Sequence, residues 1–283
     1  MNLIKYLLAA TLLLSISACD TTSGEIGEDL AVIEAFIFAG EPVDNIRVTS
    51  TVLFSSADTI SSPINDAQLR LIKNDVTYAL EARGVDGYYY YPGDDLTVDP
   101  GDHFILEMDY LGERATAETN VPPPPVSVTL DSTVMEVPSF EIGVGRPPRG
   151  GGPGGGPGGG FGDQLTVTWD NSNDLLHYVV INGLEEDHES IFPEFLGQRI
   201  RGFRFISEPN RDSFFEINLL ILEGLGFHEA KVYRVNQEYA DLYDNRTQDS
   251  RDLNEPPDNI DGALGIFSAF NSMSVPFEVK REE

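Results

Sequence analysis

Hydrophobic and polar residues alternate with a period of two through much of the first half of the chain. The alternation is clearest in residues 46–54, while residues 30–38 form a nearly continuous apolar stretch. Successive side chains of a strand point to opposite faces, so both segments are predicted to be strands. Further apolar segments are separated by short turn-forming links, which predicts two hairpins. The hairpins pair residues 67–72 with 76–80 and residues 104–110 with 115–119.

The first half is therefore predicted to form a β-sandwich. Together with residues 88–91, the pattern gives about seven short strands in roughly ninety residues and contains no helical window. The order of strands and turns, with Asp-Gly-Tyr at 86–88 and Pro-Gly-Asp at 100–102, looks like transthyretin-like or collagen-adhesin B-type modules of secreted bacterial proteins. In such modules the strands serve as a scaffold.

The second half carries the same strand pattern with one exception. Strand-like segments occupy residues 126–137, 165–169, 175–182, 201–207, 213–222, 230–235 and 275–279. The exception repeats apolar side chains at the helical spacing i, i+4, i+7 and i+8, namely Val235, Tyr239, Leu242 and Tyr243. Asn236 stands at the N-cap position of this segment. We predict a second sandwich with one short helix that lies over it or closes one end.

Two Pro- and Gly-rich segments organise the chain. Four consecutive prolines at 122–125 are stiff and extended, and they predict a boundary between a sandwich at 30–121 and a second one at 126–283. Residues 146–162 contain an uninterrupted run of Gly and Pro, which predicts a flexible coil. This coil is either an interdomain linker or an overgrown hairpin loop of the second domain. The predicted fold class is all-β, with two Ig-like or transthyretin-like sandwiches, one short helix and a long Gly/Pro-rich loop.

The first residues have the pattern of an export signal that ends in a lipidation site. Residues 1–18 combine a positively charged start with an apolar run too short to span a bilayer, and Ile-Ser-Ala precede Cys19. We interpret 1–18 as a signal peptide, Cys19 as the acceptor of diacylglycerol, and 19–29 as a lipidated tether. The alternative is an ordinary signal peptide with a coincidental cysteine. Asp20 favours inner-membrane retention under enterobacterial rules, but the expected location is the cell envelope with a lipid anchor at the outer membrane.

Composition and charge exclude several classes of protein. The 283 residues are 41% hydrophobic, which is typical of globular domains, and carry 18 basic and 47 acidic side chains for a net charge of −29. This charge repels a phosphate backbone, so nucleic acid is not expected as a partner. The single cysteine excludes a disulfide framework and any multi-cysteine metal site.

The motifs of covalent and metal chemistry are incomplete. The sequence contains no Gly-x-Ser-x-Gly and no Ser-x-x-Lys. His188 and His228 are each followed by Glu, but the second histidine of a zinc-binding pair is replaced by Phe192 and Val232. We therefore expect no catalytic residue, no metal site and no cofactor, and we expect that the protein is not an enzyme. Paired carboxylates of a hydrolase stay open because the fold sets their separation.

Four other features are better explained by structure than by chemistry. His103 and His177, like His188 and His228, are expected at the surface or in turns rather than as metal ligands. Residues 170–174 imitate the start of a calcium loop, but Leu175 and Ile181 stand where the loop needs Gly and Glu, so a polar turn is expected. Trp169, the only tryptophan, is expected to anchor the core.

A run of four tyrosines suggests a binding surface. In a strand, Tyr88 and Tyr90 share one face and Tyr89 and Tyr91 the other, so one pair is expected to point outward. Exposed tyrosines are frequent contacts for sugars and proteins. The alternative is that they merely cover an edge strand.

Several segments together resemble one known family. They are Cys19, the opening strand 30–38, Pro-Ile-Asn-Asp-Ala at 63–67, Pro-Gly at 100–101, the prolines 122–125, Trp-Asp at 169–170, the helix 238–243, Glu-Pro-Pro at 255–257 and Asn-Ile-Asp-Gly-Ala-Leu-Gly-Ile-Phe at 259–267. This order resembles the DUF4249 lipoproteins of the Bacteroidota over nearly the whole mature chain. Ala263 and Ala269 stand where many members carry Gly, and the Gly/Pro coil is not associated with the family.

The resemblance implies a non-catalytic accessory or binding partner of a TonB-dependent outer-membrane transporter. Tyr239, Tyr243, Ile266 and Phe267 are the partner contacts that we expect in the second domain. Ile266 and Phe267 have an equally supported alternative, in which they complete the core as a terminal strand. A surface adhesion module and a carboxylate-based hydrolase are the other functional hypotheses. The identity of any small-molecule or glycan ligand is left open.

Overall fold

The computed structural model describes residues 30–51, 60–138, 164–185, 189–191, 204–222, 224–244 and 259–282, with Asp244 described by its backbone alone. The strands are β1 Ala31–Phe38, β2 Ile46–Ser50, β3 Gln68–Lys73, β4 Val76–Ala79, β5 Glu81–Arg83, β6 Tyr88–Tyr90, β7 His103–Tyr110, β8 Glu113–Asn120, β9 Val126–Leu130, β10 Val134–Val137, β11 Leu165–Asp170, β12 His177–Gly183, β13 Phe205–Ile206, β14 Phe214–Ile217, β15 Gly226–Val235, β16 Ile260–Asp261 and β17 Leu264–Arg281. A 3-10 turn, η1 Leu219–Ile221, and one helix, α3 Gln237–Asp244, complete the described elements. No helix among these residues has the length and apolar character needed to cross a membrane.

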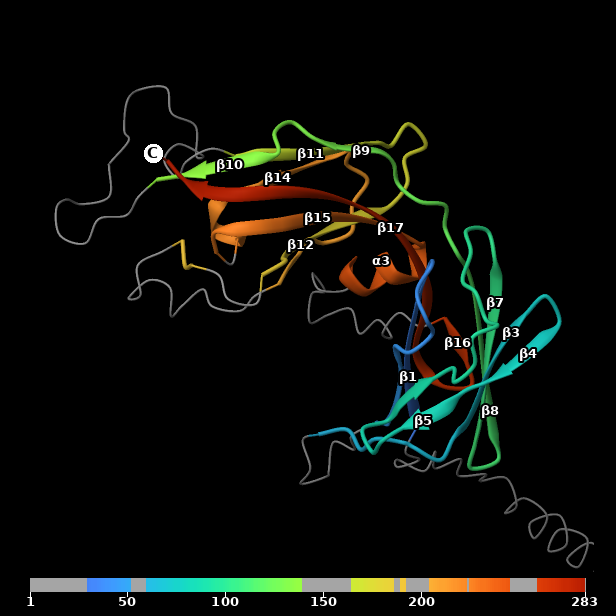
Figure 1. Ribbon diagram of the computed structural model, residues 1–283. Helices are drawn as coiled ribbons and strands as arrows, with labels where there is room; N and C mark the ends of the chain where they lie inside the picture. The colour runs from blue at the N-terminus through green and yellow to red at the C-terminus, as the bar shows by residue number, and fades with distance from the viewer. Residues whose placement is uncertain are drawn as a thin grey trace, which may run out of the picture.

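The chain is all-β and forms two sandwiches that meet at an angle (Figure 1). In the first sandwich, β5, β6, β2, β1 and the first half of β17 face the five-stranded sheet β16-β8-β7-β3-β4. Alternate residues of β1 (Ala31, Ile33, Ala35 and Ile37) point into the core between them. The predicted β-sandwich at the start of the chain is thus confirmed.

The second sandwich uses the other end of the same long sheet. Strands β13, β12, β15, the second half of β17 and β10 face the three-stranded sheet β14-β11-β9. Trp169 is 5% exposed in the core between them, as predicted. In the sequence, residues 146–162 stand between β10 and β11, which are both strands of the second sandwich.

Strand β17 joins the two sandwiches. Its residues 264–270 pair in parallel with β1, its residues 270–279 pair antiparallel with β15, and β10 pairs in parallel with its last residues. Phe267 contributes to the first core and Phe277 to the second. The predicted boundary at residues 122–125 therefore does not divide the chain into the two sandwiches. Strand β16 and the first half of β17 belong to the first sandwich, although they follow the strands of the second sandwich in the sequence.

Both predicted hairpins are present, and both turns are shorter than the predicted links. Asn74 and Asp75 (φ 52° and 62°) connect β3 to β4. Leu111 and Gly112 (φ 51° and 90°) connect β7 to β8. Positive φ at both turn residues matches the right-handed twist of the flanking strands.

The strand predicted at 213–222 is interrupted after β14. Asn218 accepts a hydrogen bond from the backbone N–H of Leu220 through Oδ1, at 3.0 Å, and so begins η1. This local bond competes with strand pairing, which periodicity alone does not reveal. The sequence does not predict strand β5, because its three residues are all exposed and show no alternation of polar and apolar side chains.

The signal peptide 1–18, Cys19 with the tether 19–29, and the Gly/Pro-rich segment 146–162 lie outside the described residues.

Candidate functional site

The angle between the sandwiches, here called the elbow, is filled by an aromatic cluster. Its members come from β1, β12, β15, α3 and β17, and are Phe36, Phe38, Tyr178, Tyr233, Tyr239 and Phe270. Tyr178 and Tyr233 stack with ring centroids 4.7 Å apart, and Phe38 stacks on Phe270 at 4.9 Å. The cluster forms because every second residue of β1 faces away from the first core.

Helix α3 covers this cluster. It begins after Asn236, as predicted, and Tyr239 packs edge-on against Phe270 at 4.8 Å. The hydroxyl groups of Tyr239 and Tyr243 lie 3.2 Å apart. Burial raises the pKa of the Tyr239 and Tyr178 hydroxyls above the ordinary value, so both stay protonated near neutral pH. Tyr239 is thus mainly a packing residue, which leaves little of its ring for a partner.

Polar bonds tie α3 to strands of the first sandwich and to β17. Glu238 Oε1 accepts hydrogen bonds from Thr119 Oγ1 at 2.9 Å and from Ser268 Oγ at 3.2 Å. Asn236 Nδ2 donates to Asn120 O at 2.8 Å and to Thr119 Oγ1 at 3.1 Å. These bonds help to hold the angle between the sandwiches.

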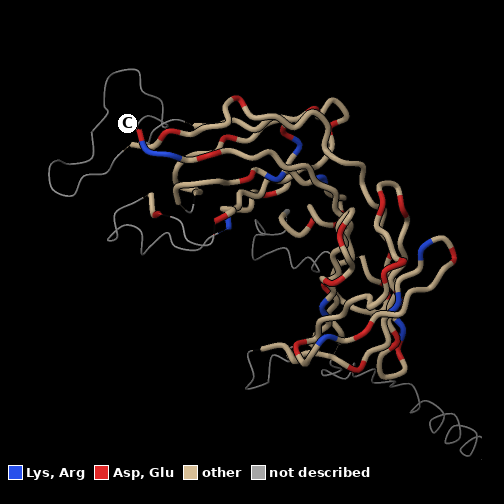
Figure 2. The backbone as a smooth tube through the Cα atoms, viewed as in Figure 1, with Lys and Arg blue, Asp and Glu red and all other residues tan. Residues whose placement is uncertain are grey.

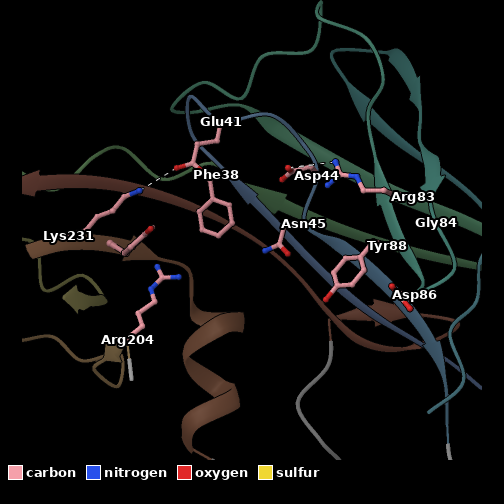
Figure 3. A pocket seen from close by; sticks show the side chains of 11 residues that line it. Phe38, Glu41, Asp44, Asn45, Arg83, Gly84, Asp86, Tyr88, Arg204 and Lys231 are labelled. Carbon is pink, nitrogen blue, oxygen red and sulfur yellow. Dashed lines mark hydrogen bonds and ion pairs between the residues drawn. The ribbon is translucent and has the colours of Figure 1, made fainter. Parts of the chain in front are cut away.

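Beside the cluster lies a cavity of about 770 Å³, here called the elbow hollow. It is lined by Phe38, Glu41, Asp44, Asn45, Arg83, Gly84, Asp86, Tyr88, Arg204, Lys231 and Tyr233 (Figure 3). The first sandwich supplies the residues up to Tyr88, and the second supplies Arg204, Lys231 and Tyr233. The hollow therefore exists only where the two sandwiches meet.

Two ion pairs border the hollow. Lys231 Nζ lies 3.3 Å from Glu41 Oε1, and an Arg83 nitrogen lies 3.8 Å from Asp44 Oδ2. Burial favours the neutral amine of Lys231, but hydrogen bonds to Tyr233 and Glu41 outweigh it and raise the pKa. Lys231 is thus a fixed cation, and its bond to Glu41 links the second sandwich to the first.

The tyrosine run follows the predicted alternation. Tyr88 is 38% exposed and faces the hollow, with the Arg47 guanidinium 5.5 Å from its ring centroid. Tyr90 lies under the guanidinium of Arg83 at 5.0 Å. Tyr89 points into the first core at 1% exposure, and its hydroxyl donates to a backbone carbonyl oxygen at 3.0 Å. Tyr88 is the member of the run with a free edge at a cavity.

Ile266 and Phe267 are not presented to a partner. They are 4% and 0% exposed, which agrees with the alternative that they complete the core. Asn259 fixes this segment, because its side-chain amide donates to Phe267 O at 2.8 Å and accepts from Phe267 N at 2.9 Å. The stretch 259–267 thus builds β16 and the start of β17, with Ile266 and Phe267 buried.

The expectation that the histidines lie at the surface or in turns is wrong for two of them. His177 and His228 are each 2% exposed, and they share the inward-facing register of Val179 and Val232. Burial lowers the pKa of His177 to about 4, so it is neutral at pH 7. His103 is exposed beside Glu118, and His188 lies outside the described residues. Within the described ranges no three metal-binding side chains gather.

The segment 170–174 is the polar turn that was predicted. The Asn171 amide donates to Leu175 O at 3.0 Å and to Arg211 O at 2.7 Å. The backbone N–H of Ser172 bonds the Asp170 carboxylate and lowers its pKa. The polar groups of this turn are thus used in hydrogen bonds within the turn and to the neighbouring segment.

Acidic side chains are spread over both sandwiches (Figure 2). The elbow hollow differs from this background because three basic residues, Arg83, Arg204 and Lys231, share one cavity. Neither Arg204 nor Lys231 carried a signal in the sequence, since each reaches the hollow only through the contact between the sandwiches.

A family model described as a domain of unknown function, DUF4249, matches residues 19–275. The chain belongs to this family. The DUF4249 match spans both sandwiches and most of β17. No curated protein matches the sequence.

Two solved structures are similar to this DUF4249 chain at low identity. Domains A168–A170 of titin share 10% identity with a TM-score of 0.22, covering 89% of this chain and 67% of that one. A segment of two fibronectin type III domains from chicken tenascin shares 8% identity with a TM-score of 0.25, covering 89% and 99%.

Proposed function

We propose that this DUF4249 protein is a non-catalytic lipoprotein of the cell envelope, anchored at the outer membrane through Cys19, that serves a TonB-dependent transporter as an accessory. The observation that carries a binding role is the elbow, where β17 runs through both sandwiches and Glu238 bonds to both Thr119 and Ser268. A fixed angle presents a preformed concave surface, which lowers the entropic cost of binding a partner.

A non-catalytic role is supported by the hydrogen bonds of two titratable side chains, the buried His177 and the partly buried Glu238. His177 Nδ1 lies 3.0 Å from a backbone carbonyl oxygen, and Glu238 accepts two hydroxyl hydrogen bonds. Both side chains thus make hydrogen bonds that stabilise the fold. The partnership with a transporter and the outer-membrane location rest on the family and on the lipidation pattern before Cys19.

Within this proposal the partner contacts lie at the rim of the elbow hollow. Tyr88 is exposed there, whereas Ile266 and Phe267 are buried. We therefore assign the docking surface to the side of the elbow that carries Tyr88 and the ion pair between Lys231 and Glu41.

Membrane anchoring is tested with the Cys19→Ser variant. It is expected to leave the membrane fraction and to lose labelling by a clickable palmitate, because serine has no thiol to accept the lipid. Ser17→Ala is the matched control, since it keeps a small residue before the cleavage site and should still be labelled. Unchanged membrane partition and labelling of Cys19→Ser would contradict the lipoprotein assignment.

The partner is tested by affinity purification from native membranes solubilised in mild detergent. A TonB-dependent receptor is expected as the main co-purified protein. Tyr88→Ala should reduce its recovery, whereas Val126→Ala, an exposed change at the start of β9, should not. Recovery of the protein alone, with measurable hydrolysis of a polysaccharide or peptide library, would overturn the proposal in favour of an enzyme. Affinity for a matrix polymer without a receptor would favour the adhesion hypothesis.

A further inference from the structure

We propose that the elbow hollow is a binding site for a saccharide that carries one carboxylate, of the uronic acid class. The inference does not depend on the membrane anchor or on a transporter partner. It rests on the size of the hollow, on one cation at its wall that has no ion pair with any described residue, and on the chemistry of the other lining side chains.

The size of the hollow fits a small ligand. Its volume of about 770 Å³ lies within the range of roughly 300 to 1,000 Å³ that is usual for small-molecule sites. Its walls come from two sandwiches that share β17, so the cavity is formed before any ligand arrives.

Arg204 supplies the cation. Lys231 and Arg83 are each paired with a carboxylate at the border of the hollow. Across the part of the chain that the structure describes, the Arg204 guanidinium has no such ion pair. Its positive charge partly offsets the rise that burial causes in the pKa of the Tyr178 and Tyr239 hydroxyls, so it lies near both rings. A guanidinium offers two parallel N–H donors that match the two oxygens of a carboxylate. An arginine that has no carboxylate partner among the described residues is available to an anionic ligand.

The other lining groups suit a ring that carries hydroxyl groups. Each ion pair places a donor beside an acceptor, and a hydroxyl group both donates and accepts hydrogen bonds. The Asn45 amide offers both functions as well, and it points toward the interior near Tyr88 (Figure 3). Tyr88 is 38% exposed, and the part of its ring that borders the hollow supplies an apolar surface on which the C–H groups of a sugar can pack.

Asp86 restricts the ligand to one carboxylate in one orientation. It lies at the opposite end of the hollow from Arg204 (Figure 3). A ligand with anionic groups at both ends is repelled by Asp86, whereas a single carboxylate is directed to Arg204. The charges of the hollow thus select both the class of sugar and its direction.

The test is isothermal titration calorimetry on the full-length purified protein with galacturonate, which carries a single carboxylate, as the probe. Neutral galactose and an acidic tetrapeptide of Asp and Glu serve as comparison ligands. Galacturonate is expected to bind, and to bind more weakly as sodium chloride rises from about 50 to about 300 mM, because the contact to Arg204 is electrostatic. The tetrapeptide is expected to bind at least about tenfold more weakly than galacturonate, because it lacks the hydroxyl groups.

Two variants and a matched control assign the contacts. Arg204→Gln should weaken galacturonate binding about tenfold or more and leave the affinity for galactose within about twofold. Tyr88→Leu should weaken both sugars, since it removes the stacking face. Lys280→Gln removes an equal charge on β17 where Lys280 pairs with Glu278, and should change neither affinity by more than about twofold. Arg204 is exposed, and unchanged melting temperatures would show that the variants fold.

Three results would overturn the inference. The first is the absence of galacturonate binding at several millimolar in the folded wild-type protein. The second is an equal loss of the neutral and the acidic sugar in Arg204→Gln. The third is binding of the acidic tetrapeptide with the same dependence on Arg204 but no binding of either sugar, which would assign the hollow to a protein partner.

Discussion

The backbone of Gly265 passes so close to Ile33 that a β-carbon at residue 265 would lie 2.0 Å from the Ile33 carbonyl oxygen. The two residues are partners in the parallel ladder between β1 and β17, and Gly265 has a φ of 120°. Only glycine combines this φ with such an approach. The contact is where the long strand β17 attaches to the first sandwich.

Gly265→Ala is expected to lower the free energy of unfolding by about 3 kcal/mol or more, through backbone strain and displacement of β1. The melting temperature should fall by about 6 °C or more. Gly101→Ala is the control, because Gly101 also has a positive φ, 89°, but no atom lies within 4 Å of an added β-carbon. The control should cost only about 1 kcal/mol. Equal losses in the two variants would contradict the importance of the contact.

Glu238→Ala should destabilise the junction between the sandwiches. It leaves the hydroxyl groups of Thr119 and Ser268, which are 3% and 0% exposed, without their carboxylate acceptor. Such a loss is expected to lower the free energy of unfolding by about 1 to 3 kcal/mol, which thermal or urea unfolding measures. Glu238→Gln keeps one acceptor oxygen and is expected to lose less than half as much. A glutamine variant as unstable as the alanine variant would show that charge, and not acceptance of the hydrogen bonds, is what matters.

Leu111→Asn should stabilise the protein. Leu111 is 81% exposed and has a φ of 51°, a backbone conformation that asparagine tolerates better than leucine. We expect a gain of up to about 1 kcal/mol and a rise in melting temperature of about 2 to 4 °C. Leu111→Ala retains a β-carbon in the same conformation and should leave the melting temperature nearly unchanged. A lower melting temperature for Leu111→Asn would mean that the leucine side chain makes contacts that matter.

His177 should make stability depend on pH in the mildly acidic range. Its pKa in the folded state is about 4, below the ordinary value of 6.5, so the unfolded chain binds a proton first as pH falls. Its contribution is complete above pH 6.5 and is lost between pH 6.5 and 4, with a size on the order of 3 kcal/mol. His177→Gln should flatten this part of the melting-temperature profile, whereas His103→Gln, at an exposed position, should not. A profile that His177→Gln leaves unchanged would assign the pH dependence to other groups.

Local patterns in the sequence predicted the features that depend on neighbouring residues. The alternation of side chains placed Tyr89 inside and Tyr88 outside, and turn chemistry located the hairpin at Asn74 and Asp75. The burial of His177 also had a signal, because it occupies the same face of its strand as Val179 and Ile181. The expectation of a surface position followed residue type and neglected that register.

Features that join distant parts of the chain had no such signal. Ile33 and Gly265 are 265 − 33 = 232 positions apart, and no periodicity indicates that their strands pair in parallel. The elbow hollow likewise combines Tyr88, Arg204 and Lys231 from separate elements. Only the two glycines within the stretch 259–267, Gly262 and Gly265, hinted at close approaches between backbones.

The course of β17 also affects the order in which the chain folds. The ribosome makes β17 after every other described strand, yet both hydrophobic cores need it. Until it emerges, β1 keeps an unpaired edge, and its partner residues are more than 200 positions away, a separation that slows folding. Neither half is therefore complete as an independent folding unit during synthesis, and a chain truncated before β17 would expose two unfinished sheets to aggregation.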